Sequence, residues 1–186
     1  MNSFTLQTQR LGLRNWMESD IAPFAAMCAD ANVMRYFPEL LSQQKAIEQI
    51  RGFQRHFAEN GFTYFAVEEL TSAEFLGFVG LKHQSFDSPY TPAIDIGWRL
   101  KKEAWGRGFA TEAAKACLDF AFEDLQLDSV LSICPTINLA SEAVMKRIGM
   151  EKAGTFQHPA IAADSPLNPC VAYLASTPRV TDGQAA

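Results

Sequence analysis

The stretch "WGRGFATEAAKACLDFAF", from Trp105 to Phe122, places two glycines around an arginine immediately before an alanine-rich helical pattern. The first N–H groups of such a helix have no intrahelical acceptor, and they lie at the positive end of the helix dipole. Both features favour an anion, and phosphate is the first candidate. Because the dipole contributes only about 0.3–1 kcal/mol per charge, backbone donors and basic side chains must supply most of the affinity.

Two phosphate motifs fit this turn poorly. A P-loop requires G-x-x-x-x-G-K-[ST], whereas Phe109 follows Gly108. The dinucleotide fingerprint G-x-G-x-x-G is closer, because Gly106 and Gly108 match and Asp128 stands about twenty residues further on. Thr111 replaces the third glycine, however, and "KKEAW" separates the preceding strand from the turn. A nicotinamide-binding protein remains an alternative, which a spectral or thermal-shift response to NAD(P)H would support.

The composition indicates one globular domain. The chain has 186 residues, of which 48% are hydrophobic and 20% charged, and no apolar run approaches the roughly 20 residues of a membrane helix. We expect a domain over residues 1–176, a polar flexible tail over 177–186, and no membrane partner. The N-terminus has no secretory signal pattern, which favours a cytoplasmic location.

Charge and metal-binding patterns exclude two further classes. A net charge of −5 argues against a nucleic-acid partner, which would require a basic face. The four cysteines form no C-x-x-C pair, and His56, His83 and His158 are scattered without H-E-x-x-H spacing. We therefore expect no disulfide framework and no metal.

Hydrophobic periodicity predicts a mixed sheet with helices on its faces, an α/β (α+β) single domain. A helix is expected from Ser42 to the left-handed stop at Asn60-Gly61, because Ala46, Ile50 and Phe53 recur at helical spacing. Further helices are expected over 21–30, 109–122 and 138–149. Strands are expected over 4–14, 62–69, 75–83, 93–100, 129–135, 150–157 and 171–176.

The turn also matches the pyrophosphate loop of the GNAT acetyltransferases, [R/Q]-x-x-G-x-[G/A], at Gly108 and Ala110, with Trp105 at the first position. Nearly the whole chain resembles the RimJ/RimL-like branch of that family, whose founding members acetylate the N-termini of ribosomal proteins. The resembling stretches include "TQRLGLRNWMESD", "VMRYFP", "GFTYFAVEE", "FLGFVGL", "IDIGWRL", "NLASEAVMKRIGM" and "HPAIAADSPLNPCVAYLA". The resemblance implies the GNAT fold, with about seven strands flanked by about four helices.

The same resemblance implies a binding site for acetyl-CoA between two splayed parallel strands. The backbone of Trp98, Arg99 and Leu100 is expected to hold the pantetheine arm in the manner of an added strand. Asn138 is the family's side-chain partner for the pantetheine, and it also reads as a plain helix N-cap; both roles are compatible. The pyrophosphate is expected on the turn formed by Trp105, Gly106, Arg107, Gly108, Phe109, Ala110 and Thr111.

Candidates for the chemistry follow from the resemblance too. Asp95 stands where this branch often has Glu and would accept the amine proton through water, although it could equally be a polar strand residue facing the groove. Met145 stands where many relatives have a Tyr that protonates the departing thiolate, and Met cannot donate a proton. Ser141 is the expected substitute; otherwise it is a helix-cap serine. Cys134 is interpreted as packing, because direct transfer needs no acyl-enzyme.

The resemblance implies an acetyl-CoA-dependent N-acetyltransferase that moves the acetyl group directly to a primary amine in a ternary complex. The acceptor would be a protein N-terminus or a small-molecule amine. The weakest expectations place Tyr36, Phe37 and Glu39 over the acceptor groove and Tyr173 facing it. A non-catalytic acyl-CoA-binding module is the alternative, motivated by Asp95 and Met145. A homodimer is the default for a small enzyme.

Overall fold

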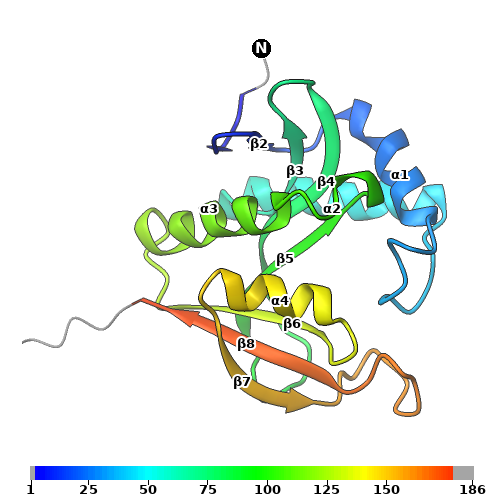
Figure 1. The fold of residues 1–186 in the computed structure, drawn as a ribbon, viewed down its shortest axis with the longest axis vertical. Helices are drawn as coiled ribbons and strands as arrows, with labels where there is room; N and C mark the ends of the chain where they lie inside the picture. The colour runs from blue at the N-terminus through cyan, green and yellow to red at the C-terminus, as the bar shows by residue number, and fades with distance from the viewer. Residues whose placement is uncertain (1–2, 178–186) are drawn as a thin grey trace, which may run out of the picture.

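The computed structural model describes residues 3–177, which form an eight-stranded mixed sheet with helices on both faces (Figure 1). The strands are β1 (Leu6–Gln7), β2 (Leu11–Arg14), β3 (Tyr64–Glu69), β4 (Glu74–Gln84), β5 (Ala93–Leu100), β6 (Ser129–Pro135), β7 (Glu151–Phe156) and β8 (Cys170–Ser176). The α-helices are α1 (Ile21–Ala29), α2 (Gln43–Asn60), α3 (Phe109–Glu123) and α4 (Leu139–Arg147), with 3-10 helices η1 (Glu18–Asp20) and η2 (Lys102–Ala104). The expected mixed α/β architecture is confirmed. The tail predicted over 177–186 lies outside the described residues, apart from Thr177.

The strand order in the sheet is β1-β2-β3-β4-β5-β6-β8-β7. Every neighbouring pair is antiparallel except β5 and β6, which run parallel. In Figure 1 the strands β6, β8 and β7 form the lower part of the sheet, and β1 to β4 form the upper part. The one parallel junction therefore lies where the two parts of the sheet meet.

The single strand predicted over residues 4–14 is wrong: the structure forms two short strands joined by a tight turn. The Thr8 N–H donates to the Leu11 carbonyl at 2.9 Å, and β1 pairs antiparallel with β2. The polar run Thr8-Gln9-Arg10 makes this turn, because polar residues with local side-chain hydrogen bonds favour turns over continued strand. This hairpin raises the strand count from the expected seven to eight.

Helix α2 begins and ends as the sequence predicts. The Ser42 hydroxyl accepts a hydrogen bond from the Lys45 N–H, which caps the first turn. Gly61 ends the helix in the left-handed conformation at φ +76°. Ala46, Ile50 and Phe53 are buried on one face, as their spacing requires.

Two of the three apolar clusters that the described residues form pack the sheet against its helices. Helix α3 buries one apolar side against β4 and β5, with Ala113, Ala114 and Cys117 fully enclosed. Helices α1 and α2 cover the opposite face around Trp16, Phe24 and nearby aromatic rings. In Figure 1, α3 and α4 lie in front of the sheet and α2 lies behind it. Within residues 3–177, none of the helices combines the length and apolar character needed to cross a membrane.

Candidate active site

Strands β5 and β6 separate soon after they meet. The only registered pair between them among the described residues is Asp95 with Leu131. One step further on, the Ser132 hydroxyl donates to the Ile96 carbonyl at 3.0 Å and bridges the two strands. Beyond this bridge β5 has no β6 neighbour in register, so its backbone borders an opening inside the sheet.

Backbone alternation decides which groups of β5 face that opening. The Lys101 N–H, just after β5, donates to the Leu76 carbonyl of β4 at 2.8 Å, so the backbone groups of alternate residues on β5 point toward β4. Arg99 shares that direction. Trp98 and Leu100 point the other way, into the opening. Of the three residues expected to present their backbone, the structure therefore offers Trp98 and Leu100, and it pairs Arg99 with β4.

The glycine turn lies at the end of β5, just before α3. Gly106 and Gly108 both adopt the left-handed conformation, at φ +73° and +81°. No described atom lies within 4 Å of a Cβ built at Gly106, and at Gly108 the nearest is the Arg10 guanidinium at 3.5 Å. The backbone conformation, rather than crowding by described protein atoms, therefore requires glycine at these two positions. Helix α3 begins at Phe109 with no side-chain cap, which leaves the N–H groups of its first turn available.

Side chains around the turn hold it in place. The Arg10 guanidinium donates to the Glu112 carboxylate at 2.7 Å and to the Arg107 carbonyl at 3.0 Å, tying the β1–β2 hairpin to the turn. These bonds, with one from Thr8, keep the pKa of Glu112 below its ordinary value although burial opposes them. The half-exposed Arg107 pairs with Glu69 at 2.6 Å.

Trp105 and Leu100 connect the turn to β5. The Trp105 indole N–H donates to the Leu100 carbonyl at 2.8 Å, while the ring is half exposed. This bond uses the carbonyl oxygen of Leu100. The groups of β5 that remain at the opening are therefore the N–H and C=O of Trp98 and the N–H of Leu100.

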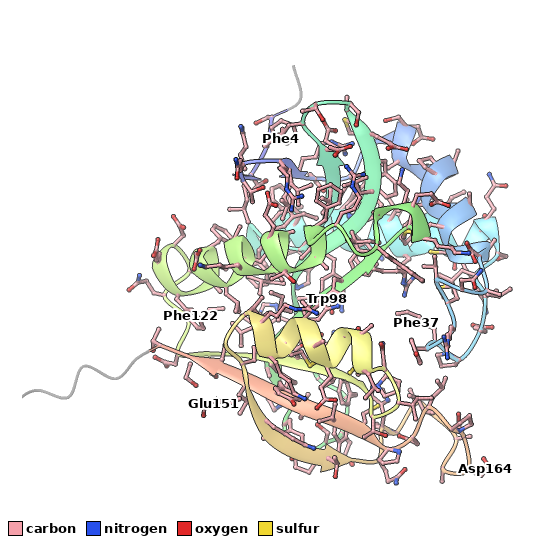
Figure 2. All side chains as sticks on the ribbon, viewed as in Figure 1. Phe4, Phe37, Trp98, Phe122, Glu151 and Asp164 are labelled. Atoms are coloured by element: carbon pink, nitrogen blue, oxygen red, sulfur yellow. The ribbon has the colours of Figure 1, made fainter. Side chains whose placement is uncertain are left out.

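A pocket of about 330 Å³ lies beside the opening and takes its walls from both parts of the sheet. Asp95 and Trp98 of β5 line it, as do Asn138 and Ser141 at the start of α4. Tyr36, Phe37 and Gln49 close it from the α1–α2 loop and from α2. In Figure 2, Trp98 lies between α3 and α4, and Phe37 lies near the loop that joins α1 to α2. The structure thus brings Asp95, Trp98, Asn138 and Ser141 to one pocket, whereas the glycine turn does not line it.

Asp95 is a buried carboxylate with defined partners. The Tyr64 hydroxyl lies 2.7 Å from both carboxylate oxygens, and the Gln84 side-chain amide donates to one of them at 3.1 Å. Burial raises the pKa of Asp95 from 3.8 to about 6, although these hydrogen bonds and the charge of Lys82 favour the ionised form. Asp95 is therefore mostly ionised at neutral pH yet basic enough to accept a proton.

Tyr64 and Gln84 are site residues that the sequence analysis missed. Tyr64 on β3 is in register with Gly80 on β4, and Gly80 is in register with Gly97 on β5. A Cβ at Gly97 would lie 3.0 Å from the Tyr64 hydroxyl, so this glycine leaves room for the ring to reach across to Asp95. The sequence signal for Tyr64 was the pair of glycines, Gly80 and Gly97, in two strands. These glycines indicate room for a ring only once the register of the strands is known.

The start of α4 forms the facing wall. The Asn138 side-chain oxygen accepts from the Ser141 N–H at 3.2 Å, which confirms its N-cap role. The Trp98 indole N–H donates to the Ser141 hydroxyl oxygen at 3.3 Å. Met145 also lines the pocket and supplies no proton donor. Burial raises the pKa of Cys134 to about 12, so this pocket residue is a neutral thiol.

Two of the four expected acceptor-groove residues line the pocket, and two do not. Tyr36 and Phe37 belong to its wall. Glu39 is exposed and pairs with Lys45 at 2.6 Å. Tyr173 is buried against α4, where its hydroxyl donates to Glu142 at 2.7 Å. The structure therefore does not bring Glu39 or Tyr173 to the groove.

Residues 3–177 contain no group of three or more His, Cys, Asp or Glu side chains that could hold a metal ion. His56 and His83 do lie together, with ring nitrogens 3.1 Å apart, but no carboxylate or thiol completes a site there.

Sequence comparison places most of the chain in one known family. The profile described as acetyltransferase (GNAT) domain matches residues 10–151, which span β2 to the first residue of β7. The chain is 31% identical over 159 residues to the uncharacterized protein YkkB of Bacillus subtilis (strain 168), covering 84% of this chain and 91% of YkkB.

Solved structures share the fold. The acetyltransferase from Agrobacterium tumefaciens str. C58 superposes with a TM-score of 0.76 at 25% identity, over 95% of this chain and 96% of that one. RimL, a ribosomal L7/L12 alpha-N-protein acetyltransferase solved in complex with coenzyme A, superposes with a TM-score of 0.72 at 18% identity, over 91% and 95% of the two chains. Together with the profile match over most of the sequence, these likenesses show that the chain belongs to the GNAT acetyltransferase family.

Proposed function

We propose that this protein is an acetyl-CoA-dependent N-acetyltransferase of the RimJ/RimL-like branch, which transfers the acetyl group directly to a primary amine in a ternary complex. The observation that supports it is the separation of β5 from β6, which leaves the Trp98 backbone free beside the buried Asp95, with the glycine turn following the end of β5. RimL, which shares the fold, was solved with coenzyme A.

The residues at the opening fit acetyl-CoA. The free N–H and C=O of Trp98 can pair with the amide groups of a pantetheine arm as a neighbouring strand would. The N–H groups of Phe109, Ala110 and Thr111, at the uncapped start of α3, suit the pyrophosphate. When bound, acetyl-CoA supplies an acetyl group activated as a thioester.

Asp95 is proposed to act on the amine. The acceptor nitrogen must be neutral to attack, and it gives up a proton as its bond to the acetyl carbon forms. A carboxylate with a pKa of about 6 accepts that proton near neutral pH, directly or through one water. Tyr64 and Gln84 hold the carboxylate in the pocket.

Ser141 is proposed to act on the leaving group. As the carbon–sulfur bond breaks, the departing sulfur takes the Ser141 proton, Ser141 regains a proton from solvent, and Asp95 releases to solvent the proton it took from the amine, so the number of protons balances. The Ser141 oxygen already accepts a hydrogen bond from Trp98, which leaves its own proton to donate into the pocket. Asn138 holds the Ser141 backbone and can contact the pantetheine through its remaining amide group.

Titration calorimetry with acetyl-CoA, followed by measurement of thiol release with a panel of primary amines, tests this proposal. The panel should hold N-terminal peptides and small amines in separate sets. We expect acetyl-CoA to bind and at least one set to release thiol faster than water alone does. Binding without release on any amine would instead support the non-catalytic acyl-CoA-binding module. The cytoplasmic location and the homodimer stay predictions.

A further inference from the structure

The side chain of Arg99 is a buried cation without an anionic partner. Arg99 is 8% exposed and lies on the same face of β5 as Asp95. Its Nη1 donates to the Cys28 sulfur at 3.2 Å and only weakly to the Gln49 side-chain oxygen at 3.5 Å. Within residues 3–177 no carboxylate forms an ion pair with Arg99, and its buried Nε has no hydrogen-bond acceptor.

Cys28 does not neutralise this charge. Burial raises the pKa of the Cys28 thiol, although the nearby arginine acts in the other direction, so the sulfur stays protonated at neutral pH. Burial likewise lowers the pKa of Arg99, but the ordinary value of 12.5 leaves the guanidinium charged.

Arg14 shows how the same fold treats a buried arginine that serves structure alone. Arg14 is 4% exposed, and the carboxylates of Asp20 and Glu68 lie 2.7 Å and 2.8 Å from it. Arg99 has instead the rings of Phe37 and Phe78, at 4.0 Å and 5.3 Å. Such cation–π contacts offset only part of the free-energy cost of removing a cation from water. Arg99 therefore lacks the carboxylate partners that compensate the buried charge of Arg14.

The incomplete edge of Arg99 suits a carboxylate. Nη1 is occupied, whereas neither Nε nor Nη2 donates a hydrogen bond to any described residue. Nε is enclosed by protein, so a carboxylate in the pocket accepts from Nη2, the partnerless nitrogen that is not enclosed. Arg99 lines the pocket together with Phe37, Gln49 and Phe78, so a pocket ligand can reach it.

The carboxylate that would pair with Arg99 is assigned to the acceptor rather than to acetyl-CoA, and this assignment rests on the proposed function. The phosphates of acetyl-CoA are assigned to the glycine turn, and its pantetheine amides and thioester carry no charge. Asp95 and Arg99 stand four residues apart on one face of β5, about 13 Å between Cα atoms. We propose that the acceptor is a small amine bearing a carboxylate several bonds away, with the carboxylate on Arg99 and the amine directed to Asp95.

The pocket volume of about 330 Å³, part of which the acetylated end of the pantetheine would fill, is in the range of small-molecule sites and favours a small carboxylate-bearing amine over a folded protein N-terminus. Lys82 is the other cation of the pocket wall, and its ammonium donates to the His83 carbonyl at 3.3 Å. Lys82 is thus the alternative cation that could bind the acceptor carboxylate in place of Arg99.

Paired acceptors test the inference. β-Alanine, 4-aminobutyrate and 6-aminohexanoate should each be compared with the corresponding amide, which keeps the amine and removes the charge. For at least one pair we expect kcat/KM to be about tenfold or more higher with the carboxylate. A dipeptide pair with Asp or Asn in the second position reports whether a peptide carboxylate serves instead.

Variants locate the preference. Arg99→Gln should raise KM for the preferred carboxylate by about tenfold or more and leave kcat/KM for its amide within about twofold. Arg99→Met should do the same, because methionine leaves no buried polar group without a hydrogen-bond partner. Thermal melts verify that both variants fold. Arg51→Gln, the same change on the exposed side of α2, should alter neither.

Equal kcat/KM for the carboxylates and their amides in the wild type would overturn the inference. It would also be overturned if Lys82→Met lost the preference for the carboxylate while Arg99→Gln kept it. A preference confined to the dipeptide pair would also overturn the small-molecule assignment. If no amine is acetylated, the proposed function fails separately. In that case calorimetric titration of 4-aminobutyrate and 6-aminohexanoate onto the protein with coenzyme A decides: binding lost in Arg99→Gln supports the inference, and no binding to the wild type contradicts it.

Discussion

Asp95 shows how burial creates a reactive group at a cost to stability. Its side chain is almost fully enclosed, and its pKa rises from 3.8 to about 6. Asp95→Asn removes the proton acceptor, so we expect turnover to fall about 100-fold or more while the affinity for acetyl-CoA changes little. Thiol release at saturating amine and acetyl-CoA calorimetry check this expectation. Wild-type turnover in the variant would remove Asp95 from the catalytic role.

The same substitution should stabilise the protein at alkaline pH. Because the folded-state pKa is raised, the contribution of Asp95 to stability is full below about pH 4 and is lost as the pH rises through about 6. The difference between 3.8 and about 6 corresponds to about 3 kcal/mol. Urea unfolding at pH 5 and pH 8 should therefore show Asp95→Asn gaining on the wild type by about 1–3 kcal/mol. A constant difference between the two pH values would contradict the raised pKa.

Tyr64 should control the pH profile through Asp95. Its phenol stays protonated, because burial and the adjacent carboxylate raise the pKa of Tyr64 well above 10, and it donates to Asp95. Tyr64→Phe removes a hydrogen bond that favours the ionised carboxylate, so the acidic limb of kcat/KM should move above pH 6. Tyr90→Phe, which changes a tyrosine outside the pocket wall, should leave that limb in place.

Ser141 should affect turnover rather than binding. Ser141→Ala removes the proposed proton donor, so we expect the rate of thiol release to fall about 10–100-fold with an unchanged dissociation constant for acetyl-CoA. Ser141→Thr keeps a hydroxyl at the same place and should recover part of the rate. Equal rates in the alanine and threonine variants would show that the hydroxyl plays no part.

At the scale of single residues, the sequence predicted those roles that follow from a residue's position along its own helix or strand. Asn138 was expected to open α4, and it does, with its side chain on the Ser141 N–H. Tyr64 and the Arg99 side chain were not predicted, because their contacts depend on which strands are adjacent and in what register. No local pattern reports that Tyr64 reaches Asp95 over Gly97.

At the scale of elements, the glycine turn depends on left-handed backbone geometry. Gly108→Ala should cost about 1–2 kcal/mol of stability, because a Cβ disfavours φ +81°, and it should also weaken acetyl-CoA binding by distorting the turn. Gly61→Ala provides the matched control, since Gly61 has nearly the same φ, +76°, at the end of α2. Both variants should lose stability in urea unfolding, and calorimetry should show a loss of affinity in Gly108→Ala alone.

Element boundaries were predictable where capping residues mark them, as Ser42 and Gly61 do for α2. The β1–β2 hairpin was not predicted. Its turn carries neither glycine nor proline, so the polar run is only a weak local signal, and the contacts of Thr8 and Arg10 with Glu112 come from about a hundred residues away. A contact over that distance leaves no periodic signal in the local sequence.

At the scale of the whole molecule, acetyl-CoA should bind across the two parts of the sheet and stabilise both. At about one hundred times its dissociation constant, a ligand that binds only the folded state adds about 2.7 kcal/mol to the free energy of unfolding. Amide hydrogen exchange gives the sharper measurement. Exchange at Trp98 and Leu100 should slow more on binding than exchange at Arg99, whose amide already faces β4 and reports the general gain in stability. Equal slowing at all three would argue against pantetheine as a neighbouring strand.

The separation of β5 from β6 gives this sheet a bare edge in its interior. Proteins commonly protect the outer edges of sheets from unwanted strand addition with short strands, charges or prolines. The inner edge at Trp98 lacks such protection, because a substituent that blocked a foreign strand would also block the ligand that belongs there. Any extended chain with amide groups can therefore compete for this edge. Tightly bound acetyl-CoA would cover the edge and so protect the protein from self-association through strand addition.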